Sequence, residues 1–134
     1  MSHSLASIPL MHTVDISMRQ QKYRSRLIVN KGNTFIVLPV KEIAYFHVEG
    51  NALSAIGFDK KQYLLNTNMR LLEEELDPRI FFRSNRQFLL NIACIKRFEL
   101  YFNGRLVVKT IPVSHEKIIV SRQNANKFKE WIDS

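Results

Sequence analysis

The sequence is short of the residues that build several common kinds of functional site. Cys94 is the only cysteine among 134 residues, which excludes an intrachain disulfide and a four-cysteine zinc site. It follows the apolar pair Ile92-Ala93, where a small buried thiol is expected rather than a reactive one. A chain without disulfides is typical of a reducing compartment, so we predict a cytoplasmic protein.

Glycine, paired histidines and long apolar runs are also scarce. The 4 glycines form no phosphate-binding loop, and neither Cys94 nor any two histidines have a spacing that implies a metal site or a nucleophile with its base. No segment approaches the roughly 18 apolar residues of a membrane span, and no basic region precedes an apolar core at the amino terminus. We therefore predict a soluble, unexported protein that is not an enzyme, has no catalytic or metal-binding residues, needs no cofactor and has no membrane partner.

Positive charge is concentrated in one part of the chain. The formal net charge is +8, and residues 79 to 129 hold 11 Lys or Arg against 2 acids, whereas residues 26 to 78 hold 6 bases and 7 acids. Crowded cations repel one another unless a polyanion relieves the repulsion, and nucleic acid is the polyanion that this pattern favours. Cations that only keep the protein soluble are the alternative.

We expect one domain preceded by a short leader. Residues 1 to 25 show no sustained periodicity and are predicted to be a leader or linker with little structure. Residues 26 to 134 suffice for a single core. Short apolar runs separated by turn residues predict strands at residues 27–30, 35–38, 44–49, 52–56 and 63–65.

Asn103-Gly104 is the strongest hairpin signal, because both central positions of a type I′ turn need positive φ. A two-residue loop there pairs Leu100 with Val107 and Phe98 with Lys109. Apolar residues then lie on both faces of the hairpin, a pattern typical of layered sheets.

Gly50-Asn51 is the second predicted hairpin turn. It would place Phe46 and Leu53 on an apolar face and leave His47 opposite Ser54 on a half-solvated face. Asn51 then lies at the exposed tip, where it is either an ordinary turn residue or a contact to a DNA groove.

Two short helices are expected. Asn68 can cap a helix over Met69 to Leu76, with its acids facing water, and Ser121 can cap one over Arg122 to Ile132. A cation in the first turn, here Arg122, opposes the helix dipole at a cost of a few tenths of a kcal/mol. Helix starts attract phosphate, so Ser121 and Arg122 could bind one; a tolerated surface arginine is the alternative.

Residues 81–91 are the most informative segment. Apolar anchors at both ends, Phe81-Phe82 and Phe88-Leu89-Leu90, would hold a polar insert at the surface from rigid ends. Arg, Asn and Gln are the side chains that bind base edges bidentately. The insert that these anchors flank contains Arg83, Asn85, Arg86 and Gln87.

Several of these pieces occur together in a fixed order. They are Tyr45 to Asn51, the helix segment that ends in Asp77-Pro78, Phe82 to Asn91, Ile95, Asn103-Gly104-Arg105 and Val120-Ser121-Arg122. As an ordered set, from about Arg26 to Ile132, they resemble the LytTR DNA-binding domain of bacterial transcription regulators. The resemblance implies an elongated, mainly β fold of layered antiparallel sheets, with one short internal helix and a C-terminal helix, that inserts loops into successive major grooves of bent DNA.

The resemblance also implies a set of contacts. Double-stranded DNA with repeated half-sites is the implied partner, bound by a homodimer, although family members vary at the contact positions and base preference does not transfer. The implied DNA-binding residues are Asn51, Asn85, Arg86 and Arg122, and secondary or phosphate contacts could come from Arg83, Gln87, Lys96, Ser121 and Lys127.

Many members of that family are response regulators of two-component systems. Their receiver domain needs on the order of 100 residues, whereas 25 residues precede the first predicted strand here. We therefore expect no receiver domain in this chain, which would be either an excised effector domain or a stand-alone regulator.

Sequence-specific binding of double-stranded DNA for transcription regulation is the predicted function. One alternative is a single-stranded nucleic-acid module, in which aromatic residues between cations would stack on bases. The candidates for such stacking are Phe81, Phe82, Phe98 and Phe102. The other alternative is a protein-interaction β domain with an incidental cationic face.

Overall fold

The computed structural model describes residues 23–134, and this part of the chain is mainly β. Its elements, in chain order, are β1 (Arg26–Lys31), β2 (Thr34–Pro39), β3 (Ile43–Glu49), β4 (Ala52–Gly57), β5 (Gln62–Leu65), α2 (Met69–Glu75), β6 (Phe81–Arg83), β7 (Phe88–Asn91), β8 (Ile95–Leu100), β9 (Leu106–Thr110), β10 (Ile118–Val120) and α3 (Arg122–Ile132). The five strands predicted from apolar runs are all present as β1 to β5.

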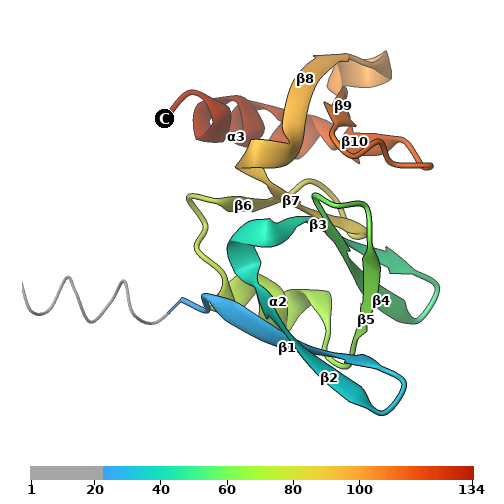
Figure 1. Ribbon diagram of the computed structural model, residues 1–134. Coiled ribbons are helices and arrows are strands. Elements are labelled where there is room, and N and C mark those ends of the chain that lie inside the picture. The colour runs from blue at the N-terminus through green and yellow to red at the C-terminus, as the bar shows by residue number, and fades with distance from the viewer. Residues whose placement is uncertain (1–22) are drawn as a thin grey trace, which may run out of the picture.

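The strands form two antiparallel sheets. The larger has seven strands in the order β2-β1-β5-β4-β3-β7-β6, and the smaller has three in the order β10-β9-β8. In Figure 1 the small sheet and α3 lie above β6 and β7, while β1, β2 and α2 lie below them. Within residues 23–134 the predicted layered antiparallel fold, with one internal and one C-terminal helix, is confirmed.

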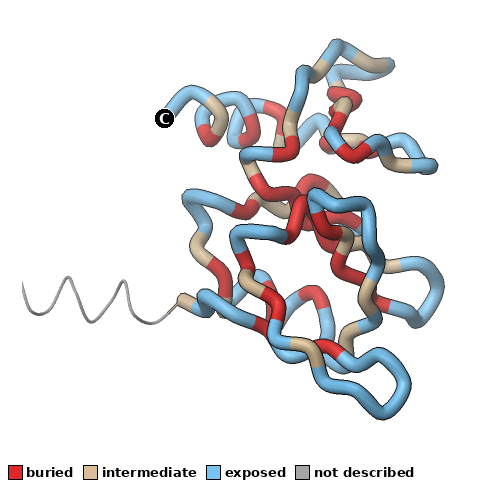
Figure 2. Tube along the Cα trace, in the orientation of Figure 1, coloured by how far each residue is buried: buried red, intermediate tan, exposed pale blue. Residues whose placement is uncertain are grey.

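The layers bury two separate apolar clusters, and β7 contributes to both. Leu89 points into the cluster under α2, whereas Phe88 and Leu90 point into the cluster under α3. All three side chains are at most 1% exposed. Burying each contributes about 1.5–3 kcal/mol, so this short strand holds the layers together. Figure 2 shows buried segments gathered where β3 and β7 pass between the two halves.

The polar insert lies where the sequence placed it. Phe81 to Arg83 pairs antiparallel with Leu89 to Asn91, so residues 84–87 form the connecting loop of a hairpin. Asn91 closes its base, because its Nδ2 donates to the Ile43 carbonyl at 2.9 Å and its Oδ1 accepts from Ala93 N–H at 2.9 Å. Four of the five predicted anchors are buried and Phe82 is half-buried, while in the loop Arg86 and Gln87 are exposed and Ser84 is buried.

The Gly50-Asn51 hairpin has the predicted register. His47 pairs with Ser54 and Glu49 with Ala52, which leaves Gly50 and Asn51 as a two-residue loop. Gly50 has φ +62, the positive value that the first central position of a type II′ turn requires. The face of Ser54 is less solvated than expected, since Ser54 is 4% exposed and its hydroxyl accepts from the Gln62 amide at 2.9 Å.

The register predicted for the Asn103-Gly104 hairpin is wrong by one residue. Asn103 and Gly104 do have positive φ, but Phe98 pairs with Val108 and Leu100 with Leu106. The observed register sets Phe98 beside Val108 in the cluster under α3, instead of opposite the cation of Lys109. Burial of these side chains therefore sets the strand register, and not the two-residue loop length that the turn residues suggested.

Both helices were predicted, with one difference in capping. Asn68 caps α2 through its side chain, which accepts from Leu71 N–H at 2.9 Å. Ser121 occupies the cap position of α3, but its hydroxyl makes no capping hydrogen bond, so the predicted side-chain cap is absent. No helix within residues 23–134 is long and apolar enough to cross a membrane.

The acids of α2 are not merely a solvated face. Glu73 pairs with Arg83 at 3.3 Å and Glu75 with Arg24 at 3.4 Å. Arg24 also donates its backbone N–H to the Glu75 carbonyl at 2.9 Å, so the last residues of the predicted leader contact the domain. The rest of that leader, residues 1–22, lies outside the described residues.

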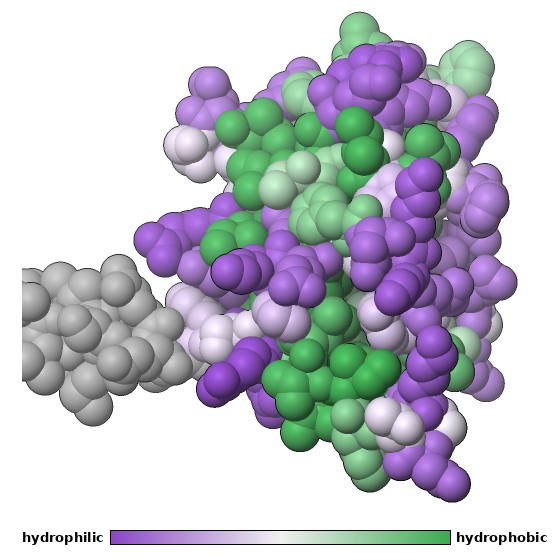
Figure 3. All heavy atoms as spheres, viewed as in Figure 1, coloured by the Kyte–Doolittle hydropathy of each residue, from purple (hydrophilic) through white to green (hydrophobic). Residues whose placement is uncertain are grey.

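One sheet face is apolar and open. The outer sides of β1, β2 and β5 expose apolar side chains to between 60% and 69%, namely Ile28, Phe35, Val37 and Leu64. Figure 3 shows apolar side chains over β1 and β2 in the lower part of the view. An apolar area of this kind is a common place of contact between proteins.

Asp77 organises the turn from α2 into β6, and its contact with Arg79 gives the fold an acid-sensitive component. Its carboxylate accepts from the Arg79 guanidinium at 2.9 Å, which lowers the pKa of Asp77 below its usual value. A carboxyl group with a lowered folded pKa stabilises the protein above its unfolded pKa, and this contribution is lost as pH falls through the folded pKa.

We therefore expect Asp77→Asn to reduce the loss of stability below about pH 4. Urea unfolding of both proteins along an acid series measures this. Arg79→Ala should flatten the same part of the curve, because it removes the partner. Parallel curves for all three proteins would show that the pair does not contribute.

Candidate nucleic-acid interface

Arg83 shapes the loop of residues 84–87 from inside. Its guanidinium donates to the carbonyls of Asn85 and Arg86, both at 3.2 Å, and pairs with Glu73 of α2 at 3.3 Å. Three directed contacts occupy this cation, so it holds the loop in place.

Asn85 fixes the same loop with its amide. Its Oδ1 accepts from the N–H groups of Gln87 at 2.7 Å and Phe88 at 3.1 Å, and its Nδ2 donates to the Ile119 carbonyl at 2.7 Å. The last bond ties the loop to β10, immediately before α3. An amide engaged on both sides is a positioning group in this conformation.

Arg86 and Gln87 are left to face outward. Both are exposed, and neither side chain makes a hydrogen bond or ion pair with another residue of the described range 23–134. The Gln87 carbonyl accepts from Val48 N–H at 2.9 Å, which joins the loop to β3. The loop therefore presents one free guanidinium and one free amide from a fixed backbone.

Arg122 is the first residue of α3 and is also exposed. Its side-chain methylenes lie against Gly104, where a Cβ would stand 3.1 Å from Arg122 Cγ. Gly104 has φ +75, so glycine serves the turn and leaves space for Arg122. The side chain is thus directed over the β8–β9 turn, and among residues 23–134 its guanidinium pairs with no acid.

Two shallow surface depressions connect these arginines. One is lined by Glu73, Arg83, Asn85, Arg86, Ser121 and Asn124. The other is lined by Asn103, Arg105, Ser121, Arg122 and Gln123. Ser121 lines both, so Arg86 and Arg122 lie on one continuous surface, which we call the basic face and define by Arg86, Arg105, Ser121 and Arg122.

The structure separates other predicted contacts from the basic face. Asn51 lies at the exposed β3–β4 tip, on a hairpin joined to the loop by the Val48–Gln87 backbone bond and to β7 by strand pairing. Lys96 lines a different depression, beside β9 and the segment that follows it. Lys127 is exposed on α3, five residues after Arg122 and so about 140° round the helix axis.

Arg105 is a member of the basic face that the sequence did not single out. It follows the β8–β9 turn, where its Nε donates to the Phe102 carbonyl at 3.0 Å and its guanidinium carbon lies 4.9 Å from the centre of the Tyr101 ring. The sequence feature that could have identified Arg105 is its position directly after Asn103-Gly104, because a cation there lies at the end of a hairpin.

Cys94 has the structural role expected of it. The side chain is fully buried, and burial raises the pKa of its thiol to about 12. A thiol with so high a pKa remains protonated at neutral pH and is a poor nucleophile. The basic face itself offers positive charge and hydrogen-bond donors, which suit an anionic partner.

The fold and the basic face define a class of small layered β domains that present cationic loops at one surface. Residues 33–133 match the family model described as the LytTr DNA-binding domain. The chain therefore belongs to the LytTR family.

Several curated proteins are similar over most of this chain. The sensory transduction protein LytT of Oceanobacillus iheyensis is 32% identical over 96 residues, which is 66% of this chain and 39% of that protein. LytT of Bacillus subtilis strain 168 is 25% identical over 121 residues, covering 89% of this chain and 48% of that protein. The transcriptional regulatory protein YpdB of Escherichia coli K12 is 25% identical over 100 residues, covering 75% of this chain and 40% of that protein. The chain thus spans less than half the length of these relatives.

A solved structure supports the fold. The LytTr DNA-binding domain of a Bacillus cereus protein superimposes with a TM-score of 0.71 at 16% identity. The match covers 83% of this chain and 99% of that one. At this identity the similarity shows a shared fold, including the layered antiparallel sheets.

Asn85→Ala should lower the free energy of unfolding by about 1–3 kcal/mol, because it leaves two N–H groups and a carbonyl without their partner. Denaturant unfolding measures the change. Gln87→Ala removes an exposed amide from the same loop and is the matched control, with an expected effect within about 0.5 kcal/mol. Equal effects of the two substitutions would contradict a positioning role for Asn85.

Proposed function

We propose that this domain binds double-stranded DNA with sequence preference and thereby regulates transcription, using loops that enter the major groove. The observation that carries the proposal is the pair of free guanidinium groups, Arg86 and Arg122, on one surface of a LytTR domain. Arginine binds guanine O6 and N7 bidentately and also binds phosphate, so each group suits either a base or the backbone.

Preorganisation of the loop supports base recognition. Arg83 and Asn85 fix the backbone of residues 84–87 with contacts of 2.7 to 3.3 Å before any partner arrives. A loop that is already ordered loses little conformational entropy on binding. We therefore assign Arg86 and Gln87 to contact DNA, and Asn85 and Arg83 to position them.

The start of α3 is suited to a phosphate. Ser121 keeps its hydroxyl free, and the first backbone N–H groups of the helix lie beside the Arg122 side chain. A phosphate there would interact favourably with the helix dipole and relieve the cost of a cation in the first turn. This role joins Ser121 to Arg122 in one contact.

The β3–β4 tip would supply a second contact region. Asn51 is an exposed amide at the end of a hairpin that is bonded to the β6–β7 loop through Val48. Asn can bind adenine bidentately in the major groove. We propose that the tip and the loop reach successive grooves, and that repeated half-sites are bound by two copies of the domain.

A single-stranded mode of binding is less well supported. Phe81 is 5% exposed, and Phe82 and Phe98 pack on Phe128 at centroid distances of 5.5 and 5.2 Å. Only Phe102 of the four aromatic candidates is openly exposed, at 70%. Stacking on bases needs several exposed rings in succession.

Protein interaction is the other candidate, and the open apolar face of β1, β2 and β5 favours it. That face is built from different strands than the basic face, so both activities can coexist. Substituting Val37→Ser and Leu64→Ser on the outer face should leave DNA binding unchanged if the basic face alone contacts DNA.

Selection of duplexes from a random pool tests the proposed function directly. The full chain should enrich a defined sequence motif, and it should bind the selected duplex more tightly than either of its separated strands. A pool without enrichment, or tighter binding to a single strand, would contradict the proposal.

Arg86→Ala should weaken binding to the selected duplex by about 1–3 kcal/mol, or roughly 5- to 150-fold, and relax its sequence preference. Arg122→Ala, at the proposed phosphate contact, should weaken binding to all duplexes alike. Fluorescence anisotropy with matched and scrambled duplexes measures both effects. Arg70→Ala is the control, because Arg70 is an exposed arginine of α2 that lies outside the basic face. Equal losses in all three variants would show that only net charge matters.

Salt dependence should report the phosphate contacts. The logarithm of the binding constant should fall linearly with the logarithm of salt concentration, with a slope near −0.9 for each phosphate neutralised. Arg122→Ala should reduce the slope by about 1, whereas Lys127→Ala, about 140° round α3 from Arg122, should leave the slope nearly unchanged. An affinity that does not change with salt would contradict a phosphate-contacting interface.

A further inference from the structure

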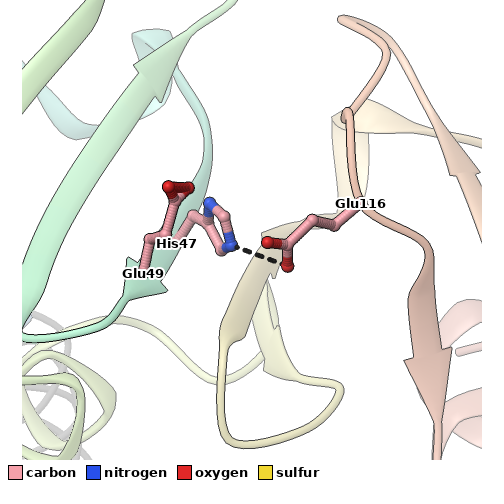
Figure 4. A group of neighbouring side chains, drawn as sticks. All are labelled: His47, Glu49 and Glu116. Carbon is pink, nitrogen blue, oxygen red and sulfur yellow. Dashed lines mark hydrogen bonds and ion pairs between the residues drawn. The ribbon is translucent and has the colours of Figure 1, made fainter.

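We propose that His47, Glu49 and Glu116 form a binding site for a divalent transition-metal ion, for which Zn²⁺ is the best match. One ligand atom from each residue can be chosen so that all three lie within 4.8 Å of one another. Figure 4 shows His47 of β3 and Glu116 of the segment between β9 and β10 facing each other, with the Glu49 carboxylate of β3 beside the His47 ring. Sequence spacing could not find this group, because Glu116 is 69 residues from His47.

The backbone brings the three residues together in a simple way. His47 and Glu49 are two apart on β3, so their side chains project from the same face of the strand. Glu116 approaches from the opposite layer, and its Oε2 lies 3.3 Å from His47 Nε2. Two ligand atoms of a tetrahedral zinc ion, each about 2.0–2.1 Å from the metal, are separated by about 3.3 Å. The observed His47–Glu116 separation therefore fits a shared ion. The exposed Glu49 carboxylate, which lies within 4.8 Å of both ligand atoms, would complete the site by a rotation of its side chain.

The imidazole is held in position before a metal binds. The His47 ring stacks on Phe88 with centroids 4.3 Å apart and planes 9° from parallel. Phe88 is fully buried, and the His47 side chain is only 14% exposed. A ligand whose orientation is fixed by packing loses little freedom on coordination.

The charges of the site are unusual for their surroundings. Residues 79 to 129 contain only two acids, and of these Glu99 pairs with Arg97 whereas Glu116 turns toward His47. A hydrogen bond between His47 and Glu116 needs no second carboxylate, yet the Glu49 carboxylate also lies within 4.8 Å of their ligand atoms. Two carboxylates close together repel each other, and a dication would relieve this repulsion.

The ligand types select the class of ion. Imidazole with carboxylate oxygen suits zinc and its transition-metal neighbours, whereas Mg²⁺ and Ca²⁺ prefer oxygen ligands alone. Three protein ligands leave a fourth tetrahedral position for water. Because one ligand comes from the segment after β9 and two from the large sheet, binding would link the two layers and stabilise the folded state.

Isothermal titration of the full chain with Zn²⁺, in a His3→Ala/His12→Ala background that removes the histidines of residues 1–22, tests the site. One ion should bind per chain, and the melting temperature should rise with Zn²⁺ concentration. Glu49→Gln and Glu116→Gln should each weaken binding by about tenfold or more. His115→Ala is the control and should bind Zn²⁺ as well as the background protein, because His115 is adjacent to Glu116 but outside the cluster.

Nuclear magnetic resonance of the ring nitrogens of histidine provides a direct readout. The His47 signals should shift on addition of Zn²⁺ and remain unshifted with Mg²⁺ at the same concentration. The proposal is overturned if no saturable binding occurs, if both glutamate variants bind as tightly as the background protein, or if His47 does not respond.

Discussion

The structure depends on the burial of β7 on both of its faces. Phe88 and Leu90 belong to one apolar cluster and Leu89 to the other, while the strand pairs with β3 on one edge and β6 on the other. A strand of four residues thereby pairs with both neighbouring strands and contributes to the two clusters that also contain residues of α2 and α3. The apolar burial and the hydrogen-bond ladder reinforce each other, because a slip of one residue would exchange the two faces and bury the wrong side chains in both clusters. The loop of residues 84–87 is therefore held at both ends by strands in a fixed register.

Polar residues around that loop divide into two roles that look identical in the sequence. Arg83 and Asn85 use their hydrogen-bonding groups on carbonyl and N–H groups of the domain, whereas the Arg86 and Gln87 side chains make no such bond within residues 23–134. The same division occurs at α3, where Gly104 directs the stem of Arg122 while its guanidinium remains exposed. Precise presentation of exposed side chains by a small domain of this kind rests on internal contacts, because it needs fixed neighbours.

Local patterns predicted much of the fold, and the failures occurred where distant residues decide. Apolar alternation and turn residues located β1 to β5, the Gly50-Asn51 register and the bounds of α3. The β8–β9 register was wrong because the packing of Phe98 and Val108 under α3 outweighs the turn, and no local signal reports that packing. Among the site residues, residue type identified Arg86 and Arg122 as exposed cations, but it could not reveal that Asn85 bonds to Ile119, 34 residues away. For the same reason the meeting of His47 with Glu116 needed the tertiary structure.

The separation between fixed and free side chains in the β6–β7 hairpin affects how such a domain can diversify. Because Arg83, Asn85 and the buried anchors set the backbone, the two outward positions, Arg86 and Gln87, can be exchanged without repacking either cluster. Under the proposed DNA-binding role, new target preferences would arise by one or two substitutions at little thermodynamic cost, whereas changes at Arg83 or Asn85 would disturb the loop backbone itself. The hairpin is therefore a natural place to redesign specificity by mutating the tip and leaving its supports intact.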